Sequence, residues 1–82
     1  MKQQEIIVAN QLAFEKIMSL MNGLDLFNKC TIVNHFRTYP HSSNPKDNHI
    51  TMIVQGLEKE IHAVRVLAWL SYKKGFDTLW DE

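Results

Sequence analysis

The chain has 82 residues, which is enough for one domain (residues 1–82). A chain this short can rarely form both a hydrophobic core and a closed catalytic pocket. Nine basic and nine acidic residues give a formal net charge of zero, which argues against a dedicated nucleic-acid binder and against an acidic mimic of DNA. Hydrophobic residues make up 45% of the chain, a share typical of folded domains that excludes a wholly disordered chain.

The first predicted element is a helix over residues 2–21, a stretch that contains no Gly or Pro. Its apolar residues recur at the three- and four-residue spacing of an amphipathic helix, at Ile6, Ala9, Ala13, Ile17 and Leu20. We expect Gly23 to end the helix, because glycine adopts the left-handed conformation without a Cβ clash. Asn10 interrupts the apolar arc, either as a half-exposed residue near the helix start or as a buried residue that fixes the register of an interface.

The second predicted element is a β-hairpin. Residues 30–39 and 49–55 are rich in β-branched and aromatic residues, which favour strands. Between them, the run SSNPKDN has the composition of a turn. We expect Cys30, Ile32 and Phe36 to share one face of the first strand.

The last predicted element is a helix over residues 57–74, ended by Gly75. Its main apolar stripe contains Leu57, Ile61, Val64, Ala68 and Tyr72. Apolar residues outside this stripe widen the face, so we expect either that the domain core wraps around the helix or that a second subunit covers the extra face. The sequence therefore predicts an α+β fold of helix, two-stranded hairpin and helix, assembled as a homodimer.

An all-α fold is the alternative. Asp25 could cap a helix over residues 26–38, and Asn44-Pro45 is a credible start for a long C-terminal helix. Apolar residues from Ile50 to Ala68 would form one helical stripe, interrupted only by Gly56. Local propensity favours the hairpin and periodicity favours the long helix.

The sequence contains no recognisable catalytic or metal-binding motif, so we expect neither enzyme activity nor a cofactor. The spacings of Cys30, His35, His41 and His49 do not match those of a zinc finger or a zinc protease. The carboxylates are scattered, and no glycine-rich phosphate loop is present. The single cysteine also excludes an intramolecular disulfide, which is typical of a cytoplasmic protein.

Two features indicate binding to another protein. On the last helix, Trp69 falls on the polar side, and Trp and Arg are enriched among residues that dominate binding energies. The C-terminal run GFDTLWDE alternates large apolar and acidic residues, and it either folds back onto the domain or docks into a groove on a partner. The predicted partner-binding residues are Trp69, Arg65, His62, Lys73, Phe76, Leu79 and Trp80.

We therefore expect a non-enzymatic regulator or inhibitor of another protein. In small size and lack of catalytic groups alone, it resembles the short regulators made by phages and mobile elements, including inhibitors of host defence. The alternative is a small nucleic-acid-binding transcriptional regulator, with basic and stacking side chains from Arg37, Tyr39, His41 and Lys46.

Overall fold

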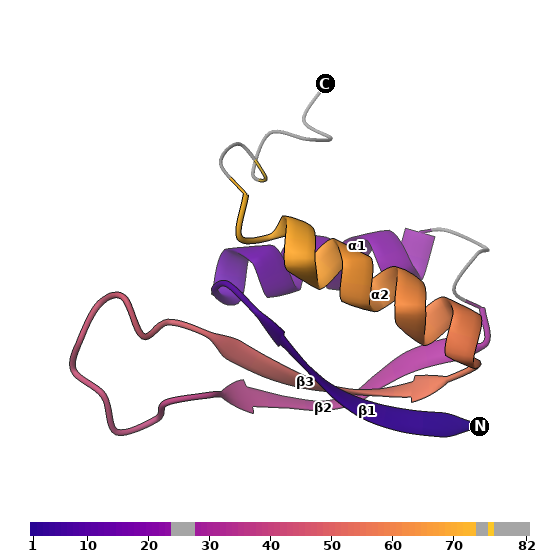
Figure 1. Cartoon of the computed structure of the whole chain (residues 1–82), viewed down its shortest axis with the longest axis horizontal. Helices are drawn as coiled ribbons and strands as arrows, with labels where there is room; N and C mark the ends of the chain where they lie inside the picture. The colour runs from indigo at the N-terminus through magenta and orange to yellow at the C-terminus, as the bar shows by residue number, and fades with distance from the viewer. Residues whose placement is uncertain (24–27, 74–75, 77–82) are drawn as a thin grey trace.

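A computed structural model describes residues 1–23, 28–73 and 76 of the chain. Its elements follow the order β1 (Lys2–Val8), α1 (Gln11–Gly23), β2 (Cys30–Arg37), β3 (Ile50–Gly56) and α2 (Glu58–Leu70). The three strands form one antiparallel sheet in the order β1-β3-β2. Both helices lie on the same side of this sheet (Figure 1). The fold is thus α+β as predicted, and the all-α alternative is wrong.

The predicted N-terminal helix is only half right, because residues 2–8 form an edge strand. In Ile6-Ile7-Val8 the first and third side chains are buried and the second is 44% exposed, which is the alternation of a strand. The helix starts after Asn10, whose side-chain oxygen accepts a hydrogen bond from the backbone N–H of Ala13 at 2.8 Å. Asn10 is therefore an N-cap residue, and this explains the polar side chain in the apolar arc.

The other boundaries are closer to the prediction. The two hairpin strands occupy residues 30–37 and 50–56, within two residues of each expected end. Helix α1 ends at Gly23 as expected, although the backbone there is not left-handed. Helix α2 ends at Leu70, four residues before the expected end, and Gly75 lies outside the described residues.

A bulge in β2 changes which of its side chains face the helices. Ile32 pairs with Val54 and Asn34 pairs with Ile53, so Val33 is the extra residue. Cys30 and Ile32 face the helices, whereas Phe36 lies on the opposite face with Thr51. The expectation that Cys30, Ile32 and Phe36 share a face is wrong, because the alternation shifts at Val33.

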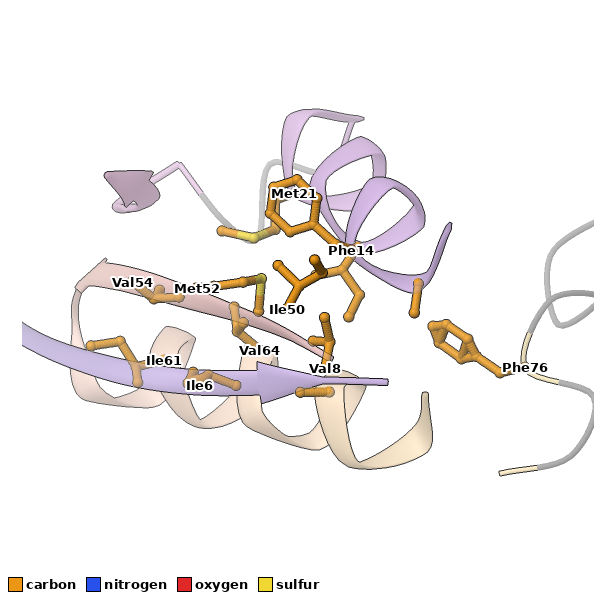
Figure 2. Packing of buried hydrophobic residues seen from close by; sticks show 13 residues of the cluster. Ile6, Val8, Phe14, Met21, Ile50, Met52, Val54, Ile61, Val64 and Phe76 are labelled. Atoms are coloured by element: carbon orange, nitrogen blue, oxygen red, sulfur yellow. The ribbon is translucent and has the colours of Figure 1, made fainter. Parts of the chain in front are cut away.

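The core lies between the sheet and the two helices (Figure 2). Strand β3 is central and contributes Ile50, Met52 and Val54, each at most 3% exposed. Phe14 and Ile17 cover them from α1. The remaining buried apolar residues are Ile6, Val8, Ala13, Met21, Ile61, Val64, Ala68 and Phe76. Leu57 and Tyr72, both expected in the apolar stripe of the last helix, are 40% and 51% exposed.

Candidate functional site

The outer surface of α2 gathers four of the predicted partner-binding residues. His62, Arg65 and Trp69 are exposed on α2, and Lys73 is exposed in the turn that follows. The residues lie three or four positions apart, so they form one strip along the flank of α2, beside the stripe of buried Ile61, Val64 and Ala68. We call these four residues, together with Val66 between them, the α2 face.

Trp69 is the most exposed hydrophobic side chain of this face, at 59%. The Lys73 ammonium lies 4.2 Å from the centre of its ring, a cation–π contact. Val66 adds apolar area and is 42% exposed. The α2 face therefore combines an aromatic centre with positive charge, the composition found at the centres of many binding surfaces.

The charges around the α2 face are mostly positive. Arg65 donates a hydrogen bond to the side-chain oxygen of Gln4, a neutral partner. Glu58, at the start of α2, is paired with Lys2 at 3.0 Å. Hydrogen bonding to Lys2, and its positive charge, lower the pKa of Glu58, and the positive charge of Arg65 also helps to lower it. This face would thus attract an acidic partner surface.

A shallow groove of about 380 Å³ runs between α2 and the outer edge of β1. Its lining residues are Gln4, Glu5, Ile6, Ile7, Arg65, Ala68, Trp69 and Tyr72. In the part of the chain that the structure describes, β1 pairs only with β3, so the groove follows an unpaired strand edge. A partner side chain that contacts Trp69 would therefore also lie beside β1.

The predicted tail residues separate into two groups. Phe76 is 3% exposed and belongs to the core, so its side chain is not on the surface. The burial of Phe76 supports the prediction that the start of the tail folds back onto the domain. Leu79 and Trp80 lie outside the described residues.

A second exposed apolar group lies on the sheet face away from the helices. Ile7, Phe36, Tyr39 and Tyr72 are each between 44% and 51% exposed, and the rings of Tyr39 and Tyr72 lie close to that of His49. Ile7 and Phe36 flank Thr51 in the sheet, and Ile7 and Tyr72 also line the groove between α2 and β1. We call Ile7, Phe36, Tyr39, His49 and Tyr72 the aromatic patch. The sequence predicts Tyr72 in the apolar stripe of the last helix, Phe36 on the face of Cys30, and Ile7 within the first helix. The alternation of Ile6, Ile7 and Val8 was the signal that could have placed Ile7 correctly.

The residues of the nucleic-acid alternative do not form one surface. Arg37 pairs with the buried Ile50 and lies on the helix side of the sheet, beside Asn10 at the start of α1. Tyr39 lies on the other side, with its ring 5.8 Å from that of His49. His41 and Lys46 are exposed in the connection between β2 and β3.

The connection between β2 and β3 is held by its own polar side chains. The Ser42 hydroxyl donates to the Asp47 carboxylate at 2.6 Å, and Asn44 accepts from the backbone N–H of Lys46 at 3.0 Å. These are the local contacts of Asn- and Ser-containing turns, as the sequence predicted. The connection extends beyond the end of the sheet (Figure 1).

The histidines and the cysteine are dispersed. His35 stacks on Phe14 on the helix side, with ring centres 4.3 Å apart, whereas His49 lies on the opposite face. Cys30 pairs with Gly56 and His35 with Met52, four residues apart along β3, so about 13 Å of strand separates them, too far for a thiolate–imidazole pair. Among the described residues, no three His, Cys, Asp or Glu side chains are placed to hold a metal ion.

Cys30 sits beside a buried carboxylate. Glu60 is 5% exposed and accepts a hydrogen bond from the backbone N–H of Lys29 at 3.1 Å. Burial, and secondarily the negative charge of Glu60, raise the pKa of the Cys30 thiol. The thiol therefore lacks the lowered pKa of reactive cysteines.

Comparison with known protein families, curated proteins and solved structures finds no match to this chain. Within the described ranges, none of the helices is both long and apolar enough to cross a membrane. Functional inference thus depends on the two surfaces above, the α2 face and the aromatic patch.

Proposed function

We propose that the protein is a non-enzymatic regulator or inhibitor that binds another protein through its α2 face. It would act in the cytoplasm as a homodimer. The exposure of Trp69, together with the Lys73 ammonium over its ring and the neighbouring Arg65 charge, is the observation that supports this proposal. The chemistry of the face favours a partner with acidic side chains around an apolar pocket.

Trp69 keeps a large apolar area in water when no partner is bound. A tryptophan side chain can bury about 150–250 Å² when a partner covers it, and its indole N–H can then donate a hydrogen bond. Arg65 and Lys73 add charge-assisted hydrogen bonds to carboxylates. A few such anchors can supply most of the affinity of an interface.

The lack of catalytic groups fits a protein that acts by occupying a surface. Regulators of this kind, including inhibitors of host defence or regulatory machines made by phages and mobile elements, need an interface and no chemistry of their own. The nucleic-acid alternative has weaker support, because its residues lie on different sides of the sheet. A salt-dependent mobility shift of DNA or RNA would revive it.

The test is quantitative affinity capture from the native host, read by mass spectrometry, with wild-type and variant proteins. Trp69→Ala should weaken binding of the captured partner by about 30-fold or more, equivalent to about 2 kcal/mol. Leu12→Ala is the matched control, because Leu12 is an exposed apolar residue on α1, at 48%. Undiminished partner binding by a correctly folded Trp69→Ala variant would refute the role of the α2 face.

A further inference from the structure

We propose that a second copy of this chain packs onto the open face of the sheet, with the aromatic patches of the two copies at the centre of the interface. This inference specifies the surface of the homodimer, and to that extent rests on the proposed function. It uses the side of the sheet away from both helices. The α2 face adjoins this surface, because Ile7 and Tyr72 also line the groove beside Trp69. His62 and Val66 of the α2 face lie outside that groove.

The strand register places the open-face side chains in three rows across the sheet. The rows are Ile7–Thr51–Phe36, Glu5–Ile53–Asn34 and Gln3–Gln55–Thr31. The first row is the most apolar. Its central residue, Thr51, is only 4% exposed although no helix covers this face. The Thr51 hydroxyl shares a hydrogen bond of 2.8 Å with that of Thr38.

The aromatic patch continues the first row toward the end of the sheet. The backbone N–H of Thr38 donates to the carbonyl of His49 at 2.9 Å, which extends the β2–β3 ladder by one pair. The His49 ring lies 5.8 Å from that of Tyr39 and 5.7 Å from that of Tyr72. Two strands, the connection after β2 and the turn after α2 thus bring apolar side chains to one place.

The open face is nearly free of charge. Of the nine strand side chains in the three rows, only that of Glu5 is ionisable. A solvated sheet face usually carries polar and charged residues at alternate positions. Two copies of this face can therefore pack together without placing like charges next to each other, except where Glu5 of one copy approaches Glu5 of the other. The absence of basic residues in these rows also leaves phosphate groups without a partner.

The area of the patch is sufficient to begin a dimer interface. Four large side chains, each about half exposed, leave roughly 400 Å² of mostly apolar surface, the size of the largest patches on monomeric proteins. Two copies would bury roughly 800 Å² through the patches alone. The remaining open-face residues, with Ile53 at their centre, would bring the total near the roughly 1,200 Å² of a stable interface. Face-to-face packing of two sheets is also a common arrangement.

Sedimentation velocity of the purified full chain over a wide concentration range tests this proposal. The wild type should form dimers, and Phe36→Asp or Tyr39→Asp should weaken association at least about a hundredfold, because each buries an unpaired charge in the interface. Val66→Asp is the matched control, since Val66 is an exposed apolar residue of the α2 face that does not line the groove shared with Ile7 and Tyr72, and it should leave the dimer intact. A monomeric wild type, a dimer that persists in both patch variants, or a dimer lost in Val66→Asp would overturn the proposal.

A second measurement avoids dependence on variants that fail to fold. In a mixed sample of isotope-labelled and unlabelled wild-type protein, filtered nuclear Overhauser spectra should show contacts between copies that involve the Ile7 methyl groups and the rings of the patch. Contacts between copies confined to α2 would refute the proposal. So would saturable binding of a fluorescent single-stranded oligonucleotide that Phe36→Asp abolishes. Patch variants that are monomeric but still capture the partner would leave the α2 proposal standing, so the two failures are distinguishable.

Discussion

Replacing Gly56 by alanine should destabilise the fold because of a close approach between two strands. Gly56 is the last residue of β3 and pairs with Cys30 of β2. A Cβ atom built at Gly56 would lie 2.6 Å from the carbonyl oxygen of Lys29 and 2.8 Å from the Cα of Cys30. Both are backbone atoms, so the start of β2 would have to move as a unit. Because the Gly56 backbone is not left-handed, the cost comes from space and not from backbone strain.

We expect Gly56→Ala to lower the free energy of unfolding by about 1–3 kcal/mol, the usual cost of overpacking. A chain of this length has a total stability of roughly 4–12 kcal/mol, so the loss should be visible in a urea titration. Gly23→Ala is the control, because no atom lies within 4 Å of its added Cβ and its backbone is not left-handed. That variant should be neutral or more stable by up to about 1 kcal/mol. Titrations should be run at several protein concentrations, so that dimerisation does not obscure the comparison. Equal stability of the two variants would refute the reasoning.

Three further predictions concern the start of α1, the core and the thiol. Asn10→Ala should cost about 1 kcal/mol in a urea titration, because the backbone N–H of Ala13 loses its cap, whereas Asn10→Asp should retain most of the stability; equal losses would argue against capping. Phe14→Ala should cost about 3–5 kcal/mol and remove the stacking on His35, which the chemical shifts of the imidazole protons should report; unchanged shifts in a folded variant would contradict this contact. Alkylation of Cys30 should reach its half-maximal rate at a higher pH than alkylation of a free cysteine peptide, because burial and the charge of Glu60 raise the pKa of the Cys30 thiol. Glu60→Gln should shift this pH profile to lower pH, and an unchanged profile would exclude the Glu60 carboxylate as a cause.

The hairpin could be predicted from the sequence because its signals are local. Both strands contain β-branched runs, and the connection between them contains Asn-Pro and Asp-Asn pairs. By contrast, β1 could not be separated from the helix that follows it. Only Ala9 and Asn10 lie between the two elements, and Ile6 and Ala9 happen to continue the helical spacing of α1. Pairing with β3, which is far along the chain, is what makes residues 2–8 a strand.

The α2 face could be predicted from the sequence and the aromatic patch could not, again because only the first depends on local spacing. Trp69 and its basic neighbours lie on α2 and in the turn that directly follows it, so their spacing in the sequence was enough to place them together. The aromatic patch collects side chains from four parts of the chain. Phe36 reaches it only because of the extra residue at Val33, and a bulge leaves no clear signature in a run of apolar and polar residues.

The position of β3 in the sheet has a consequence for the way the chain folds. Both outer strands hydrogen-bond to β3 and not to each other, yet β3 is synthesised after both of them. The connection of residues 38–49 closes the pairing of β2 with β3, whereas β1 must close a loop of residues 9–49. The longer closure costs about 1 kcal/mol more in chain entropy. The hairpin should therefore form first on the nascent chain, and the N-terminal segment should remain without its strand partner until β3 has left the ribosome.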